Sequence, residues 1–321
     1  MLRKLLTAAA VVIGLAGAAQ AAWPERPITL IVPWATGGGT DAIARMLASG
    51  LEKQLGQPVN VVNRVGGSGI VGHTEMINAR PDGYTIGFGT GELATYYWNG
   101  TAPFKTDSFN PIALVNVDAA AIWVSAKSES KTLPELIAAI KKAPSGSFKI
   151  TAPIGAAYHL AVSDLFISQG IDPKSVTLVP SQGAAPGFQE IASGGVQIAP
   201  FSLPEGKAML EAGVIRPLAI LSKTRHPNYP DVPTVKEAMG VDIAGGTWRS
   251  VVGPKTLPAD ISNKLSDAVE KVVNTPEFKT FMTERGFGLA WEKQAGFAKF
   301  MADVQTKNGE VMKALGLRTR D

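Results

Sequence analysis

Nine residues, PWATGGGTD at positions 33–41, combine the features of an anion-binding turn. They follow a run of β-branched residues, ITLIV, and precede a helical pattern, AIARMLASGLEKQL. Consecutive glycines let amide N–H groups approach a guest closely, and the first turn of a helix adds unpaired donors and positive potential. The pattern therefore predicts a site for a small anion. The alternative is an ordinary turn in which Thr40 or Asp41 caps the helix.

Nucleotide sites are not favoured by the glycine patterns. A phosphate loop ends in Gly-Lys-Ser/Thr, whereas here Gly39 and Thr40 are followed by Asp41, which would repel a triphosphate. Residues 67–72 match G-x-G-x-x-G, and Glu92 lies 20 residues beyond Gly72, but three residues separate this motif from the strand-like VNVVN. We expect no cofactor, and a second loop of backbone donors lining the same cleft.

A histidine lies in a third loop, GAAYHL at 155–160, again between a strand-like and a helical segment. His159 could act as a base or metal ligand, or it could order its loop. His73 and His226 do not share metal-ligand spacing with it, and neither G-x-S-x-G nor H-E-x-x-H occurs. We expect no metal and no catalytic residue. A hydrolase using His159 and Asp41 remains an alternative.

Aromatic and cationic side chains accompany these loops. Trp34 directly follows a strand-like run, and Trp248 in GGTWRSVVGP is expected in the core. The charge of Arg249 in the same stretch must be paired, and either an internal carboxylate or the ligand could pair it.

Strand-like runs alternate with helical patterns from Ile28 onward, which predicts parallel sheets covered by helices, with the ligand site beyond the strand ends. Two long extended stretches, 111–128 and 245–254, interrupt this rhythm, and Thr-Leu-Pro and a helix follow each. Thr132 is expected to cap the first of these helices. We therefore predict two lobes joined by two crossover strands, with lobe one at 22–120 and 249–321 and lobe two at 121–248.

The first residues predict export. Arg3 and Lys4 precede a short apolar run, and Ala19-Gln20-Ala21 is a small-x-small cleavage site, so residues 1–21 read as a signal peptide and Ala22 as the mature start. The chain has no cysteine, which excludes disulfides, thiolate chemistry and lipidation at the cleavage point. A formal charge of +4 without basic clusters does not indicate nucleic-acid binding. We expect a periplasmic protein.

The ordered set of motifs resembles a known family. The segment from WPERPITLIVPWATGGGTD to RVGGSGIVG, then ARPDGYTIGFGT, KTLPEL, GAAYHLAVSDLF, VPSQGAAP, RPLAIL and GTWRSVVGP, is similar to substrate-binding proteins of tripartite tricarboxylate transporters, the Bug family. The resemblance covers essentially the whole mature chain. It implies a type II periplasmic binding protein whose lobes close on a small carboxylate and deliver it to a membrane permease.

The resemblance also implies a site built mostly from backbone amides and hydroxyls. The candidate ligand-binding residues are Trp34, Ala35, Gly38, Gly39, Thr40, Asp41, Ser68, Gly69, Thr90, Gly91, Gly155, Ala156, Ala157, His159, Ser181, Gln182, Gly183, Ser202 and Arg249. The second lobe departs from the family pattern. Ser181-Gln182-Gly183 replaces a common Tyr-Lys-Gly, Phe201-Ser202 stands where many relatives have an acid, and Ala156-Ala157 replace a hydroxyl.

Trp34 together with Trp248-Arg249 resembles the branch associated with tricarboxylates, which would make Arg249 a second anchor for a polycarboxylate. We therefore expect a monomeric receptor for a small carboxylate, with a di- or tricarboxylate favoured. A receptor that serves an extracytoplasmic sensor kinase instead of a permease is the alternative.

Overall fold

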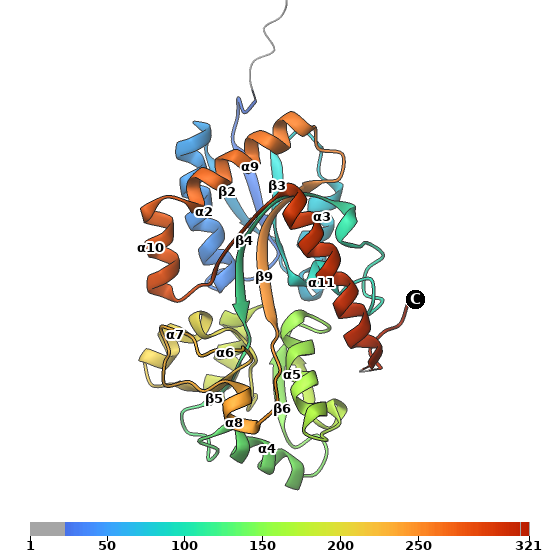
Figure 1. Cartoon of the computed structure of the whole chain (residues 1–321), viewed down its shortest axis with the longest axis vertical. Coiled ribbons are helices and arrows are strands. Elements are labelled where there is room, and N and C mark those ends of the chain that lie inside the picture. The colour runs from blue at the N-terminus through green and yellow to red at the C-terminus, as the bar shows by residue number, and fades with distance from the viewer. Residues whose placement is uncertain (1–22, 315, 321) are drawn as a thin grey trace, which may run out of the picture.

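The computed structural model describes residues 23–314 and 316–320, so the expected signal peptide at 1–21 and mature start at Ala22 lie outside the described residues. The chain forms two α/β lobes along its long axis, and strands β4 (Phe109–Ala119) and β9 (Gly246–Pro254) run between them (Figure 1). Among the described helices, none is long and apolar enough to span a bilayer.

Lobe one is built on a six-stranded sheet in the order β10-β4-β9-β3-β1-β2. Its other strands are β1 (Ile28–Val32), β2 (Val59–Asn63), β3 (Thr85–Thr90) and β10 (Leu289–Lys293). The pairs β1–β2 and β1–β3 are parallel as the alternation predicts, whereas β9 runs antiparallel to β3 and β4, and β10 antiparallel to β4. The sheet is mixed because β9 returns from lobe two. It enters the sheet beside the carboxyl ends of β1 and β3 and therefore runs in the opposite direction to them.

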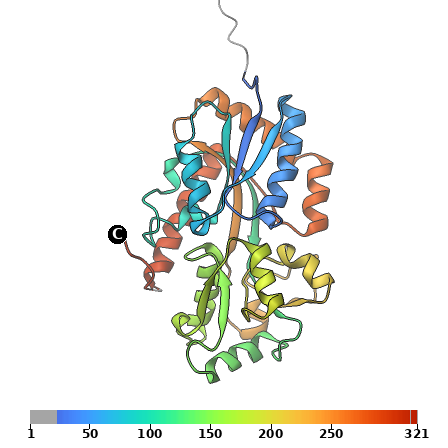
Figure 2. The ribbon, with the colours of Figure 1, turned by 180° about the vertical axis from the view of Figure 1, so that it is seen from behind.

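Helices cover both faces of this sheet. They are α2 (Gly39–Leu55), α3 (Ile70–Asn78), α9 (Ala259–Val273), α10 (Pro276–Arg285) and α11 (Gln294–Ala314), with short 3₁₀ turns η3 (Gly67–Gly69), η4 (Gly91–Ala94) and η5 (Thr106–Ser108). Side chains alternate along β1, so Leu30 and Val32 join the core with α2, α9 and α10, whereas Ile31 joins the core with α3 and α11. From behind, β1 and β2 are seen between the blue helix α2 and the cyan helix α3 (Figure 2).

Lobe two contains two short strand pairs and five helices among the described residues. Its elements are β5 (Ala121–Ser125), α4 (Leu133–Lys142), β6 (Lys149–Ala152), α5 (Ala157–Ser168), η6 (Pro173–Ser175), β7 (Thr177–Pro180), α6 (Ala184–Ser193), α7 (Leu203–Glu211), β8 (Ile215–Ile220) and α8 (Val235–Met239). Strands β5 and β8 are antiparallel and β6 and β7 parallel. The strand-like VQIAPF forms only isolated bridges, at Ile198 and Ala199, which connect the two pairs. Thr132 caps α4 as its sequence predicts.

Separate hydrophobic clusters stabilise the lobes. One cluster contains buried residues from Ala120 to Val235, and the other two contain residues up to Val115 and from Trp248 onward. The two crossover strands are in backbone contact at the hinge, where the Ala120 amide donates to the Gly245 carbonyl at 2.8 Å. Two cores joined by two strands give a molecule that can flex between lobes.

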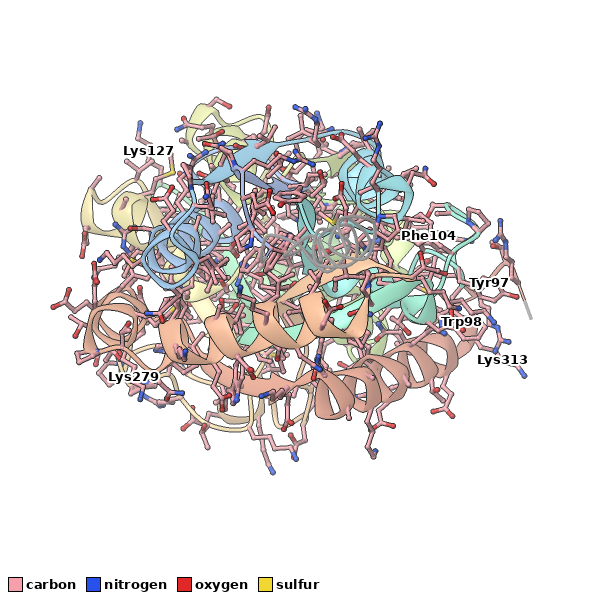
Figure 3. The ribbon with its side chains drawn as sticks, turned by 90° about the horizontal axis from the view of Figure 1, so that it is seen from above. Tyr97, Trp98, Phe104, Lys127, Lys279 and Lys313 are labelled. Atoms are coloured by element: carbon pink, nitrogen blue, oxygen red, sulfur yellow. The ribbon has the colours of Figure 1, made fainter. Side chains whose placement is uncertain are left out.

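The last described residues return to the edge of lobe one. Tyr97, Trp98 and Phe104 lie toward one side of the molecule, the side that also carries Lys313 (Figure 3). The Thr319 amide donates to the Trp98 carbonyl at 2.8 Å, and the guanidinium of Arg318 lies 4.5 Å from the Trp98 ring centroid. This contact fixes the end of the chain beside lobe one.

Candidate functional site

A small cavity lies between the lobes at the carboxyl ends of β1 and β3. It is lined by Trp34, Ala35, Gly38, Gly39, Thr40, Glu92, Pro153, Tyr158, Gly183, Ala184, Phe201, Glu205, Thr247 and Arg249. Its volume is about 20 Å³, which is room for about one water molecule. The lobes are therefore closed on each other, and a solute needs them to separate before it can enter.

Hydrogen bonds across the lobe boundary hold this closed arrangement. The Ala35 amide donates to the Gln182 carbonyl at 3.1 Å, and the Ile154 amide donates to Ser68 Oγ at 2.9 Å. Near the same edge, Asn99 Nδ2 donates to the carbonyl of Gly155 at 3.3 Å.

The start of α2 supplies donors to the cavity. Gly38 is the N-cap residue and has no side chain to cap the helix. Within the described part of the chain, no hydrogen bond uses the amides of Gly38, Gly39, Thr40 or Asp41. We call these four amides the α2 cradle. Unpaired amides at the positive end of a helix favour an anion.

Asp41 organises this turn from behind. Its Oδ2 accepts from the Gly37 amide at 3.0 Å, and its carboxylate also accepts from the Arg45 side chain and, at 2.9 Å, from Asn63 Nδ2. Asn63 in turn donates to the Trp34 carbonyl at 2.9 Å. Burial opposes ionisation of Asp41, but the hydrogen bonds from Arg45, Gly37 and Asn63 outweigh it and lower the pKa. The charged side chain is thus a fixed part of the loop.

His159 orders a loop of lobe two in the same way as Asp41 orders the loop before α2. It is the third residue of α5, as Asp41 is of α2, and its Nδ1 accepts from the Gly155 amide four residues earlier at 3.1 Å. Burial lowers the pKa of His159, so the imidazole is neutral, with its proton on Nε2. The contact orders a loop and does not require catalysis.

A chain of hydrogen bonds connects Trp34 to Glu92, and both residues line the cavity. Trp34 Nε1 donates to Thr90 Oγ1 at 3.1 Å, and Thr90 Oγ1 donates to the Glu92 carboxyl. Burial raises the pKa of the Glu92 carboxyl, and the hydrogen bond from Thr90 offsets only part of this rise. Glu92 in the closed cavity is therefore a weaker acid than an exposed glutamate.

Arg249 on β9 lies at the base of the cavity and is only 1% exposed. Its Nε donates to Thr40 Oγ1 at 2.9 Å, and its Nη1 to Asn116 Oδ1 and, at 2.6 Å, to Asp118 Oδ2. Its Nη2 donates to Glu205 Oε1 at 2.9 Å. Burial alone would lower the pKa of Arg249, but Glu205 and Asp118 raise it, so the guanidinium stays charged. Two internal carboxylates thus pair this cation.

Glu205 reaches the cavity from lobe two. It is the third residue of α7 and forms a capping box with Ser202, whose amide and hydroxyl donate to Oε2 at 3.2 and 2.8 Å. The Tyr158 hydroxyl donates to the same oxygen at 2.7 Å. The carboxylate lies against the α2 cradle, because a Cβ atom at Gly39 would be 2.9 Å from Oε1. It contributes the only charge that lobe two brings to the described cavity lining.

The structure brings seven of the candidate residues to the cavity wall, and they are Trp34, Ala35, Gly38, Gly39, Thr40, Gly183 and Arg249. The others lie behind it or at the lobe boundary. Asp41, Thr90, Ser181, Ser202 and His159 make the internal hydrogen bonds of the loops, and Ser68, Gln182 and Gly155 bond across the boundary. Gly69 packs near Trp34, Ala156 is the N-cap residue of α5, and Gly91 and Ala157 line a larger groove beside the hinge.

Seven lining residues were not among the candidates. They are Glu92, Pro153, Tyr158, Ala184, Phe201, Glu205 and Thr247. For Glu205 a local signal existed, because Ser202 and Glu205 have capping-box spacing. That signal predicts a helix start and does not reveal a cavity. Among the described residues, no group of three His, Asp or Glu side chains could hold a metal ion.

Comparison with known proteins identifies the family. Residues 43–317 match the model of the tripartite tricarboxylate transporter family receptor, TctC. The chain belongs to this family. A UPF0065 protein of Bordetella pertussis is 29% identical over 99% of this chain and 98% of its own, and the protein BugT of the same organism is 30% identical over 78% and 79%.

Solved structures show the fold of this TctC-family receptor. The periplasmic binding protein BugD is 25% identical with a TM-score of 0.84, and covers 92% of this chain and 99% of its own. A protein of R. palustris solved with adipate is 27% identical, with the same TM-score and coverage. MatC from Rhodopseudomonas palustris with bound malate is 25% identical with a TM-score of 0.81, covering 90% and 99%. The expected type II periplasmic binding protein fold is confirmed.

Proposed function

We propose that this TctC-family receptor works as a periplasmic monomer that captures a small carboxylate between its lobes and delivers it to a membrane permease. The observation that carries the proposal is the α2 cradle of four unpaired amides, because three of its residues, Gly38, Gly39 and Thr40, line the cavity together with Arg249. Neutral donors at a helix start bind a carboxylate without needing a free cation.

Structural neighbours support this chemistry. Two similar proteins were solved with adipate and with malate, which are both small carboxylates. Binding between lobes also provides a signal to a permease, because a ligand with higher affinity for one arrangement of the lobes shifts the population toward it.

A thermal-shift panel tests the proposal. We expect the mature protein to melt at a higher temperature with its ligand, since a solute that binds only the folded state stabilises it by about 2.7 kcal/mol at one hundred times its Kd. The panel should cover mono-, di- and tricarboxylates, amino acids and aromatic acids. Absence of any shift across it would overturn the receptor assignment.

Recovery of the ligand separates binding from hydrolysis. Because His159 and Asp41 each accept a backbone N–H within their own loop, we expect ligands to be recovered unchanged after incubation. Turnover that is lost in His159→Ala would instead establish a hydrolase.

A further inference from the structure

One ion pair crosses the cavity from lobe to lobe. Arg249 lies on β9 in the sheet of lobe one, and Glu205 lies on α7 in lobe two. Their side chains meet at 2.9 Å, and both are almost fully buried, with side-chain exposures of 1% and 5%. In the closed structure, a positive group of lobe one therefore faces a negative group of lobe two.

Each charge is fixed to its own lobe. Arg249 is held by Asn116 and Asp118 on the adjacent strand β4, and Glu205 is held by the capping box of Ser202. When the lobes part, these local bonds keep Arg249 with lobe one and Glu205 with lobe two. The Arg249–Glu205 pair is then the ion pair that breaks, together with the hydrogen bonds across the lobe boundary.

A solute that enters between the lobes therefore meets a cation and the α2 cradle on one side and a carboxylate on the other. We propose that the ligand is a zwitterion, a small monocarboxylate that carries an ammonium group, and that Glu205 determines this specificity. The ligand carboxylate lies at the α2 cradle beside Arg249, and its ammonium faces Glu205. This inference rests on the proposed function and narrows its ligand class.

The physical reason for preferring a zwitterion is the order in which the charges of the protein and the ligand alternate across the cavity. A zwitterion inserted between Arg249 and Glu205 replaces the one ion pair that spans the lobes by two, while Asp118 keeps its own pair with Arg249. A di- or tricarboxylate instead places a second negative charge beside the buried Glu205. The starts of α5 and α6 offer backbone donors to a second carboxylate, but these donors do not remove its repulsion from the charge of Glu205.

Matched ligand pairs test the order of charges. Malonate and glycine, succinate and β-alanine, glutarate and 4-aminobutyrate, and adipate and 5-aminopentanoate each differ by one terminal carboxylate or ammonium. One of these pairs should have the chain length that fits the site. For that pair, titration calorimetry on the full mature protein at pH 7 is expected to show that the amino acid binds at least tenfold more tightly than the dicarboxylate.

Glu205→Gln tests the assigned residue. The amide keeps the size of the side chain and removes its charge, so we expect the preference for the amino acid to fall at least tenfold in the same pair. Glu211→Gln is the matched control, because Glu211 ends the same helix, has a side chain that is 66% exposed, and lies outside the cavity lining. It should leave the preference unchanged.

Tighter binding of the dicarboxylate by the native protein would overturn this inference and leave the carboxylate receptor standing. An unchanged preference in a folded Glu205→Gln protein would also overturn it. If that variant does not fold, the native preference decides alone. If neither these pairs nor any acid in the broader panel binds, the proposed function fails as well.

Discussion

At the scale of single residues, the buried charge of Asp41 orders its loop through internal hydrogen bonds and is not free to bind a ligand. Asp41 has a side chain that is 4% exposed and accepts bonds from Arg45, Gly37 and Asn63. We expect Asp41→Asn to lower the free energy of unfolding by about 1.5–3 kcal/mol, the usual contribution of a hydrogen bond to a charged group. Urea denaturation at pH 7 measures this loss. Asp303→Asn, which removes an exposed pair with Lys299, is the control.

Acid should remove the contribution of Asp41. Because its folded pKa lies below the ordinary 3.8, the stabilisation is complete well above pH 3.8 and is lost as the pH falls through the folded value. The difference in unfolding free energy between native protein and Asp41→Asn should thus shrink below pH 3.8. A difference that stays constant from pH 7 to pH 3 would contradict this role.

At the scale of elements, the close approach of α2 to α7 depends on one glycine. A Cβ atom at Gly39 would lie 2.8 Å from Glu205 Cγ and 3.0 Å from Arg249 Nη2, whereas a Cβ at Gly38 would meet nothing nearer than 3.7 Å. We expect Gly39→Ala to prevent full closure and leave both lobes folded. Small-angle X-ray scattering should then show a larger radius of gyration than for the native protein.

Gly38→Ala is the matched control for this experiment, because it adds the same methyl group one residue earlier. Its scattering curve should equal that of the native protein. Equal curves for Gly38→Ala and Gly39→Ala would show that α7 does not limit the approach of the lobes.

At the scale of the whole molecule, the two crossover strands set how the lobes can move. A Cβ atom at Gly246 would lie 2.0 Å from the Asp118 carbonyl oxygen and 2.7 Å from Ala119 Cα. Backbone cannot yield as a side-chain end does, so we expect Gly246→Ala to cost about 1–3 kcal/mol of unfolding free energy or more. Urea denaturation measures this loss, and Gly38→Ala serves as the control. A change within about 0.5 kcal/mol would mean that the hinge adapts freely.

Local patterns in the sequence were enough for most of the elements, although VQIAPF forms only isolated bridges. Hydrophobic periodicity identified β1, α2, β9 and the helix that Thr132 caps, because such signals depend on neighbours a few residues apart. The alternation of strand-like and helical segments did not reveal that β9 runs antiparallel to its neighbours β3 and β4. Strand direction depends on how the chain returns from the other lobe.

The sequence by itself therefore determined two lobes and two crossovers, and it predicted an anion site at the start of α2. The tertiary structure decided what pairs with Arg249. Its partners Glu205, Asp118 and Thr40 lie 44, 131 and 209 residues away, and no spacing rule connects them. The reason is physical: bonds within a helix turn follow from local geometry, whereas a buried charge takes whichever opposite charge the docking of lobes and strands brings within reach.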